Sequence, residues 1–405
     1  MSALTETLPL SDRVVNMEES ATLAMAQAAR ELAAKGVKVI NLSVGEPDFK
    51  TPAYICDAAK KAIDAGHHQY TPVPGIPALK NAIVTKLKRD NNIDATANQI
   101  VVSTGAKQSI ANVILALVNP GDEVVILGPY WVSYADVVKF AGGIPVIVSG
   151  DINTGFKPTA DQIGAACNEK TKAVLYSSPS NPAGALFSEE ELKAMIKVVP
   201  EHVIFMADEI YEYINYVGKH TSMGSLEGAK DRTVTINGFS KGFAMTGWRV
   251  GYICAPQWLA KATDKIQGQV TSGTNSITQH ACVTALEDYT NMTKSINEMG
   301  EAFLRRRDLL ISLLQEIKGV NVATPEGAFY LFPDVSYYFG KTAPDGTVIK
   351  DSMDLSLYLL NFAHVSSVAG EAFGAPKNLR FSYATSDENL KEAAVRLKEW
   401  LGKLA

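Results

Sequence analysis

The chain has 405 residues, of which 46% are hydrophobic and 20% are charged, and its net charge is −5. This composition predicts a globular protein of two or three domains with a substantial core. The acidic balance offers nothing that would attract a polyanion, and no apolar run approaches the roughly 18 residues of a membrane span. We therefore expect neither a nucleic-acid partner nor a membrane partner.

The four cysteines, Cys56, Cys167, Cys254 and Cys282, are far apart and form no CxxC pair. This pattern is typical of reduced thiols in a cytosolic protein, and we predict no metal site. The first residues, MSALTETLPLSDR, lack the basic start and apolar run of a secretory signal. We expect the protein to be cytoplasmic.

The N-terminal part of the chain predicts a polar arm, one helix and one strand. Residues 1–17 are polar, an alanine-rich helix opens at Glu19-Ser20 and ends near Gly36, and residues 37–42 form a short strand. The next segment, VGEPDFKTP, is dense in Gly, Pro and Asp. We place a domain boundary there, so that residues 1–48 form an arm and part of a small domain.

The middle of the chain predicts a large α/β domain, residues 49–300. Helices at 53–65 and 76–89 precede a repeated alternation of strand and helix that begins at Gln99. Continuous apolar strands with helices between them indicate a parallel sheet covered on both faces, which is a doubly wound arrangement. Strands are expected at 100–102, 123–127, 144–148, 172–176 and 203–207, and helices at 107–118 and 131–140.

Residues 301–405 predict a smaller α+β domain. A long helix at 291–318 carries the chain out of the large domain. The remainder holds the segment GAFYLFPDV, a helix at 355–363 and a strand at 379–383. We expect this part to pack with the N-terminal segment, so that the small domain draws on both chain ends.

The segment 237–252, NGFSKGFAMTGWRVGY, carries the most informative residues. It follows an apolar strand at 233–236, and the link to the next apolar run, 249–255, is too short and glycine-rich for a crossover helix. Lys241 is therefore expected on a tight turn at the carboxyl end of a strand, where open α/β sheets bind ligands. A desolvated lysine there can lose its proton and form a Schiff base with an aldehyde, and Arg249 suits an anion such as phosphate. The common alternative is a solvated surface lysine.

Other residues of interest follow predicted strands, and each also has an ordinary structural explanation. Asp208, in DEIY, either caps the next helix or faces a ligand, and Asn181, in SPSNPAG, is ordinarily part of a turn. The helix start at Gly105-Ala106-Lys107 is either a simple βα turn or an anion site made of free N–H groups. Trp131, in PYWVSY, is by base rates an interior aromatic residue. Arg380, inside the apolar strand LRFSY, needs an anionic partner that no acid on that strand supplies, and its guanidinium suits a carboxylate.

SKGFAMTGWRVGY resembles the lysine segment of the class I aminotransferases of fold type I, which bind pyridoxal 5'-phosphate (PLP). It is most similar to the bacterial aspartate aminotransferase branch, which also contains prephenate aminotransferases. The resemblance extends from about Ser20 to Ser386. It implies a mostly parallel sheet in which the strand at 249–255 runs antiparallel, and a ping-pong transamination.

The resemblance implies the following roles around the cofactor ring. Lys241 holds PLP as a Schiff base and then moves a proton between the substrate α-carbon and the cofactor. Asp208 keeps the pyridine nitrogen protonated, so that the ring can absorb electrons from a carbanion. Tyr211 and Asn181 hydrogen-bond the 3-oxygen of the ring, and Trp131 stacks on its face. The family pattern NPTG reads NPAG here, which removes a hydroxyl but leaves the amide of Asn181 in place.

The resemblance also implies a phosphate site and a dimer. The backbone of Gly105 and Ala106 and the side chain of Arg249 are expected on the cofactor phosphate, and Ser240 could add a hydroxyl. Tyr70, in HHQYTP, matches a tyrosine that reaches the phosphate of the neighbouring subunit. A homodimer with shared sites follows from this match.

On the substrate, the resemblance assigns the α-carboxylate to Arg380, with the Gly45 backbone nearby. Lys107 matches a residue that contacts the distal carboxylate, helped by the hydroxyls of Ser20 and Thr22, although Lys107 could equally be a solvated helix residue. A distal carboxylate supports aspartate with 2-oxoglutarate, and prephenate remains possible because it also brings a second carboxylate. The expected substrate contacts are Ser20, Thr22, Gly45, Lys107, Trp131, Asn181 and Arg380.

Three other classes of protein share parts of this pattern. A nicotinamide dehydrogenase would need a GxGxxG after a strand, and none opens a helix here. A PLP-dependent lyase or decarboxylase would share Lys241 and Asp208, but only a transaminase converts 2-oxoglutarate to glutamate. A regulator on this scaffold would carry a fused DNA-binding domain, and roughly 45 residues without a basic helix leave little room for one.

Overall fold

The computed structural model describes residues 10–15 and 21–405, and at positions 12, 13, 21 and 22 it describes the backbone alone. The predicted arm and the predicted helix start at Glu19-Ser20 therefore lie largely outside the described residues. In the described part of this region, α1 spans Asp12–Val15 and α2 spans Ala21–Ala34.

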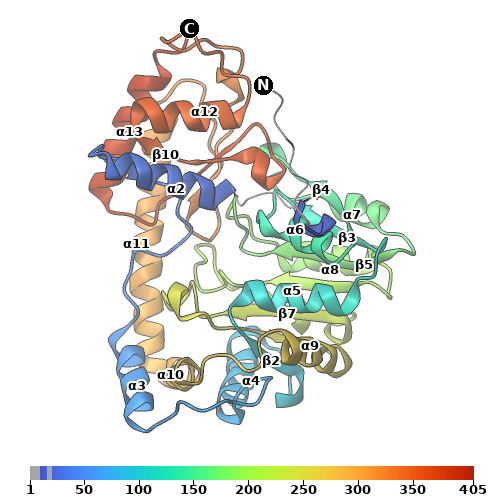
Figure 1. Cartoon of the computed structure of the whole chain (residues 1–405). Coiled ribbons are helices and arrows are strands. Elements are labelled where there is room, and N and C mark those ends of the chain that lie inside the picture. The colour runs from blue at the N-terminus through green and yellow to red at the C-terminus, as the bar shows by residue number, and fades with distance from the viewer. Residues whose placement is uncertain (1–9, 16–20) are drawn as a thin grey trace.

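The largest sheet in the described residues has seven strands in the order β2-β8-β7-β6-β5-β3-β4 (Figure 1). The pairings are parallel except those of β8, which runs antiparallel to both β2 and β7. The predicted α/β fold is confirmed, and so is the direction of β8. In sheet order the strands span Ile100–Ser103, Gly251–Cys254, Thr233–Gly238, Ile204–Asp208, Thr171–Ser177, Glu123–Gly128 and Ile144–Ser149.

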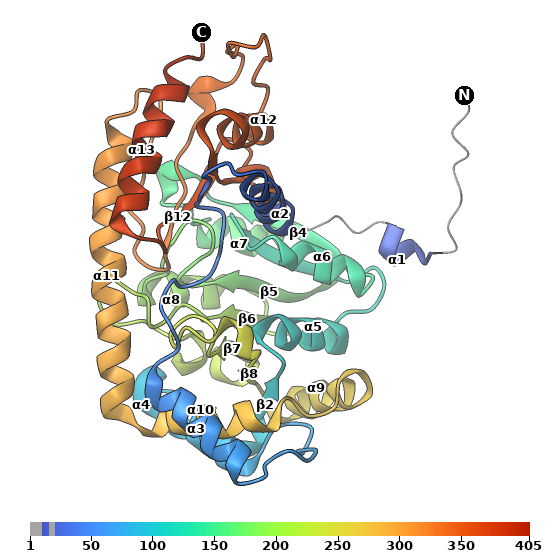
Figure 2. The same ribbon diagram turned by 60° about the vertical axis from the view of Figure 1, so that its left-hand side comes forward.

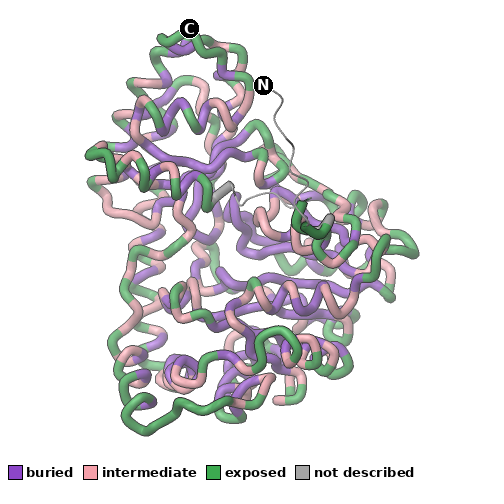
Figure 3. Tube along the Cα trace, in the orientation of Figure 1, coloured by how far each residue is buried: buried purple, intermediate pink, exposed green. Residues whose placement is uncertain are grey.

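Most strands of this sheet are apolar on both sides, so both of its faces have to be covered. Helices cover them, and most of the strands are almost fully buried as a result (Figure 3). One face packs against α5, α6 and α9, and the other against α7 and α8 toward one edge and α3, α4 and α10 toward β2 and β8. These helices span Ala106–Leu117 (α5), Ser133–Phe140 (α6), Gln257–Val270 (α9), Ala160–Ala166 (α7), Glu189–Val198 (α8), Ala53–Asp64 (α3), Pro77–Asn91 (α4) and Ser276–Glu287 (α10).

The rest of the chain forms a smaller α+β part built from both chain ends. The long helix α11 (Tyr289–Gln315) runs along one side of the molecule and leads from α10 to this part (Figures 1 and 2). Strand β1 (Ile40–Asn41) pairs in parallel with β10 (Val365–Ser366), which joins the two ends. A second sheet has the order β11-β12-β9, and helices α12 and α13 complete the part. These last elements span Val368–Ala369, Leu379–Ser382, Tyr330–Leu331, Ser352–Tyr358 and Asp387–Leu401. The domain boundaries at 48 and 300 stay a prediction.

Two predicted strands are too long. The strand predicted at 37–42 has only two residues, Ile40–Asn41, because it pairs with an equally short β10. The strand predicted from Arg249 begins at Gly251, because Arg249 has a left-handed φ of 57° that breaks the extended backbone.

Some helices also differ from the prediction. The helix predicted at 355–363 is α-helical only through Tyr358 and continues as a π-helical turn over Leu359–Ala363. No helix is predicted at α7, α8, α9, α10 or α13, all of which form. None of the helices in the described ranges is long and apolar enough to cross a membrane.

Candidate active site

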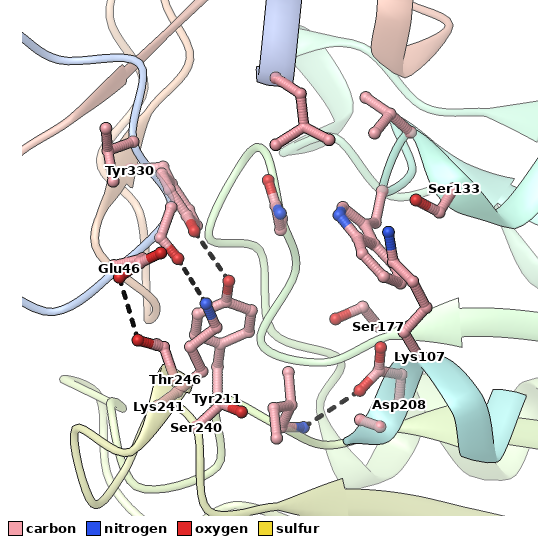
Figure 4. Close-up of a pocket in the computed structure, with 18 of the residues that line it drawn as sticks. Glu46, Lys107, Ser133, Ser177, Asp208, Tyr211, Ser240, Lys241, Thr246 and Tyr330 are labelled. Atoms are coloured by element: carbon pink, nitrogen blue, oxygen red, sulfur yellow. Dashed lines mark hydrogen bonds between the residues drawn. The ribbon is translucent and has the colours of Figure 1, made fainter. Parts of the chain in front are cut away.

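A cavity of about 370 Å³ lies at the carboxyl ends of the parallel strands, between the large sheet and the smaller part. Ser177 at the end of β5 and Asp208 at the end of β6 line it from the sheet, and Tyr330 of β9 and Arg380 of β12 line it from the smaller part. Figure 4 shows Lys241, Tyr211 and Tyr330 on one side of this cavity and Lys107 and Ser133 on the other.

Lys241 lies on a turn just after β7, as predicted, and points into the cavity (Figure 4). Its Nζ donates a hydrogen bond to the carbonyl of Gly45. Burial lowers the pKa of Lys241 to about 8, and Arg380 and Arg249 act in the same direction, whereas the carboxylate of Glu46 opposes them. This lysine is therefore not a solvated surface residue, and its amine can be neutral near physiological pH.

Asp208 occupies the last position of β6 and is only 4% exposed. Its carboxylate accepts hydrogen bonds from the hydroxyl of Tyr134 at 2.6 Å and from the backbone N–H of Ile210 at 3.3 Å. Burial raises the pKa of Asp208 to about 6, although these two hydrogen bonds lower it. A turn follows Asp208 instead of a helix, so the helix-capping explanation is wrong. A buried carboxylate of this kind is suited to a cationic partner.

Arg380 is 1% exposed and has no carboxylate partner among the described residues. Its guanidinium donates to Asn181 Oδ1 at 2.9 Å and to the carbonyl of Ser43 at 2.7 Å. The Nε atom has no hydrogen-bond partner within the described part of the chain. Since a guanidinium keeps its charge, this end of the cavity offers a site for an anion.

A second cationic position lies at the start of α5. Gly105 precedes the helix with a φ of 86°, and the free N–H groups of the first turn begin at Ala106. Arg249 packs so closely there that a Cβ on Gly105 would lie 2.5 Å from its Nη2 atom. A helix start beside a guanidinium favours a phosphate or another anion.

Tyr211 and Trp131 provide aromatic walls. The Tyr211 hydroxyl lies 2.8 Å from the Tyr330 hydroxyl, and burial raises the pKa of Tyr211 well above its usual value. Trp131 is only half-buried, its ring packs edge-on against Tyr134, and Lys107 Nζ lies 4.8 Å from its centroid. Trp131 therefore faces the cavity and is not an interior aromatic residue.

The cavity brings together most of the predicted site residues. Gly105 lies directly behind its wall, whereas Tyr70 lies outside it with a fully exposed side chain. Ser20 lies outside the described residues, and Thr22 is described only by its backbone. The predicted residues that line the cavity are Gly45, Ala106, Lys107, Trp131, Asn181, Asp208, Tyr211, Ser240, Lys241, Arg249 and Arg380.

Other lining residues are not among the predicted ones. Tyr134 binds Asp208, Tyr330 binds Tyr211, and Thr246 donates a hydrogen bond to Glu46 at 3.0 Å. The only sequence signal for Tyr134 is its spacing of three residues from Trp131, which places both on one side of a helical turn. Helix α2 also lines the cavity, through the side chains of Leu23, Ala26 and Arg30.

Comparison with known proteins identifies the family. Residues 37–397 match the sequence model described as "Aminotransferase class I and II". The chain is 46% identical over 400 residues to the aspartate/prephenate aminotransferase of Cereibacter sphaeroides, covering 98% of this chain and 99% of that protein. It is 43% identical over 399 residues to the aspartate aminotransferase of Bacillus subtilis, covering 98% and 100%.

Among solved structures, the aspartate aminotransferase of Rhizobium meliloti superimposes with a TM-score of 0.93 at 41% identity, covering 98% of this chain and 100% of that one. The aspartate aminotransferase of Thermus thermophilus with maleate gives 0.91 at 39% identity, covering 97% and 99%. Because the family match spans most of the chain, this protein belongs to the class I and II aminotransferases, in the branch that contains the aspartate and aspartate/prephenate enzymes.

Proposed function

We propose that the protein catalyses the PLP-dependent transfer of an amino group from L-aspartate to 2-oxoglutarate by a ping-pong mechanism. The observation that carries this proposal is a half-buried lysine, Lys241, which points into the cavity that it shares with the buried carboxylate of Asp208 and whose pKa is lowered to about 8. When bound, PLP would supply an aldehyde and a ring that accepts electrons from the substrate α-carbon.

The residues of the cavity fit this cofactor. The start of α5 with Arg249 is a cradle for its phosphate, and Ser240 adds a hydroxyl at the cavity wall. Asp208, whose buried carboxylate suits a cation, would hold the protonated pyridine nitrogen. Tyr211 and Asn181 would bind the 3-oxygen, since the amide oxygen of Asn181 accepts from Arg380 and leaves its nitrogen as a donor. Trp131 would cover the ring face.

The side chains of this protein then divide the remaining work. Lys241 would bond the cofactor covalently at rest and, once released, take the proton from the α-carbon of the amino acid. Arg380 would orient the substrate by its α-carboxylate through the donors that face the cavity, with Gly45 alongside. Trp131 and Tyr330 would shield the reacting carbon from water. In the second half of the cycle, Lys241 would run the transfer in reverse and deliver a proton to the carbon that entered as the carbonyl carbon of the keto acid.

Replacing Lys241 tests the proposal. We expect Lys241→Ala to lower turnover of aspartate with 2-oxoglutarate by about 10²–10⁴-fold or more and to abolish the Schiff-base absorbance. Lys265→Ala, which changes an exposed lysine of α9, is the control and should behave as wild type. Retention of both turnover and absorbance in Lys241→Ala would disprove the assignment.

The aspartate preference rests on Lys107. Its ammonium stands at the cavity edge beside Trp131, and burial, assisted by Arg249, lowers its pKa. A distal carboxylate on the substrate would pair with it. We expect Lys107→Ala to lower kcat/KM about 10- to 100-fold for aspartate, which corresponds to a hydrogen bond between charged groups, and to leave alanine nearly unchanged. Equal losses on aspartate and alanine, measured by steady-state kinetics, would remove this role.

Prephenate is a second candidate substrate, favoured by the name of the Cereibacter sphaeroides relative, an aspartate/prephenate aminotransferase. Prephenate also brings a second carboxylate for Lys107. Assays with aspartate as the amino donor and either 2-oxoglutarate or prephenate as the acceptor decide between these two acceptors. Glutamate formation from aspartate and 2-oxoglutarate excludes a PLP-dependent lyase.

We further propose a homodimer in which each subunit completes the site of the other. Tyr70 is fully exposed in the single chain, which leaves its hydroxyl available to the phosphate site of a neighbouring subunit.

A cytoplasmic location also stays a prediction.

A further inference from the structure

The segment 208–212, DEIYE, presents different residues to its two sides. Asp208 and Tyr211 line the cavity, whereas Glu209 and Glu212 do not and are only 1% and 7% exposed. Two carboxylates are therefore buried directly behind the residues proposed to hold the cofactor ring. Buried carboxylates are unfavourable unless they are paired and hydrogen-bonded.

Glu212 is held by helix α4. Its carboxylate forms an ion pair with Lys86, which is 1% exposed. Asn91, the last residue of α4, donates to the other Glu212 oxygen at 2.6 Å and accepts from Lys86 Nζ at 2.6 Å. The same amide donates to Ser222 Oγ at 2.8 Å, which links this group to the loop after the segment.

Glu209 is held by that loop. Ser222 Oγ donates to Glu209 Oε2 at 2.6 Å, and His220 Nε2 lies 3.2 Å from the same oxygen. Asn91 and Ser222 thus join the two carboxylates in one hydrogen-bonded network, with Lys86 against Glu212 and the His220 ring beside Glu209. Neither ring nitrogen of His220 has a hydrogen-bond partner among the described residues.

The charges of this network balance only if His220 is protonated. Two carboxylates, Glu209 and Glu212, face one lysine. Two further acids lie nearby: Asp90, which is paired with Arg89, and Asp208 on the cavity side. Tyr176, Tyr252 and Cys254 also lie near Glu209, and burial raises their pKa values so that they stay neutral. Burial on its own would lower the pKa of His220, but the carboxylates of Glu209 and Glu212 outweigh it, and the pKa is raised despite the opposing charge of Lys86.

Asp208 itself has few contacts that fix its direction. Apart from the Tyr134 hydroxyl and the Ile210 N–H, its orientation depends on the backbone of the segment. That backbone is pinned where Ser178 N–H donates to the Asp208 carbonyl at 3.0 Å, where Glu209 N–H donates to the Ile236 carbonyl at 2.8 Å and where Glu212 N–H donates to the Glu209 carbonyl at 2.9 Å. Loss of the charges behind the segment would let it shift.

We propose that Lys86 and His220 are positioning residues for the reaction: by neutralising Glu212 and Glu209 they fix the segment 208–212, and so hold the Asp208 carboxylate and the Tyr211 hydroxyl toward the cofactor ring. This inference rests on the proposed function. Neither residue lines the cavity, so each acts only through the carboxylate that it binds.

Substitutions of His220 and Lys86 in the PLP-loaded protein test this role. We expect His220→Asn to lower kcat about 10- to 100-fold, the loss typical of a misplaced catalytic group, while KM for aspartate stays within about two-fold. The absorbance of the bound cofactor should change its pH midpoint, and PLP affinity measured by fluorescence titration of the cofactor-free protein should fall.

Lys86→Arg should retain most of the activity. Should Lys86→Met fail to fold, the double variant Lys86→Met/Glu212→Gln, which removes the unpaired charge, should fold and still show the spectral change.

Ser356→Ala is the matched control, because Ser356 is fully buried, bonds Ser367 and does not line the cavity. It should lower Tm without changing kcat or the spectrum. If His220→Asn lowers only Tm, as this control does, the positioning role is wrong while the proposed function stands. If the wild type neither binds PLP nor transaminates, the proposed function itself fails.

A bound metal would also overturn the inference. Oxygen and nitrogen atoms of Glu209, Glu212 and His220 lie within 4.8 Å of one another, a spacing that one ion could bridge. We expect elemental analysis of the purified protein to find no stoichiometric metal, because the ammonium of Lys86 already contacts Glu212. A stoichiometric divalent ion that is lost in His220→Asn would replace the positioning role with a metal site.

Discussion

Asp208 illustrates how one side chain can favour function at the expense of stability. Its pKa rises from 3.8 to about 6 on folding, so the folded protein binds more protons than the unfolded chain between these values. The stability that this group contributes therefore falls as pH rises from 3.8 to about 6, and above that range its charge is a cost that the hydrogen bonds from Tyr134 and Ile210 offset only in part.

We predict that Asp208→Asn stabilises the cofactor-free protein by on the order of 1–3 kcal/mol above pH 6 and by little below pH 4, because it removes the buried charge. The same change should lower kcat roughly 100-fold or more, because the ring nitrogen loses its partner. Urea unfolding of the cofactor-free protein at both pH values, together with steady-state kinetics, measures this. Asp231→Asn, at an exposed position, is the control. A variant that is less stable than wild type at pH 8 would contradict the argument.

The individual site residues differ in how far the sequence predicts them. Lys241, Asp208 and Arg380 follow or interrupt apolar strands, and that placement identifies them as unusual. The partners that fix them are distant in the chain: Tyr134 is 74 residues from Asp208, and Tyr330 is 119 residues from Tyr211. Contacts of this kind depend on tertiary packing, which no local pattern encodes.

The contact between β8 and α5 shapes the anion site. A Cβ on Gly251 would meet the backbone of Gly105 and Ala106 more closely than real Cβ atoms approach. We predict that Gly251→Ala displaces the start of α5 and weakens PLP binding by about 10-fold or more, since overpacking costs about 1–3 kcal/mol. Fluorescence titration of the cofactor-free protein measures the affinity. Gly247→Ala places its methyl group in open space and should bind PLP as wild type does; equal affinities for the two variants would refute the prediction.

The strands of the large sheet are predicted well because they are short, continuous apolar runs. The amphipathic helices on its surface carry weaker signals. Helix α8 does begin with a capping box in which Ser188 and Glu191 bond each other's backbone, and Ser386 caps α13, so both starts are visible in the sequence. The left-handed backbone of Arg249 and the π-helical turn after Tyr358 are set by the surrounding packing and are not visible there.

The molecule as a whole is proposed to work as a pair of chains with shared sites. We predict that mixing the inactive variants Tyr70→Ala and Lys241→Ala under conditions that exchange subunits restores about one quarter of wild-type activity, because half of the dimers become hybrids with one intact site. Activity and molar mass would be followed together. Mixing Asp208→Asn with Lys241→Ala is the control and should restore nothing, since Asp208 and Lys241 serve the same cavity of one chain. No recovery in hybrids whose formation is verified would argue against the shared site.

Helix α2 gives the N-terminal end of the chain an influence on substrate choice. Although it lies more than 200 residues before Lys241 in the chain, its side chains Leu23 and Arg30 form part of the cavity wall, and both are exposed. Neither Leu23 nor Arg30 belongs to the residues proposed to move protons or to hold the cofactor. Exchanging these two residues is therefore a route to new donor preferences that leaves the chemistry intact.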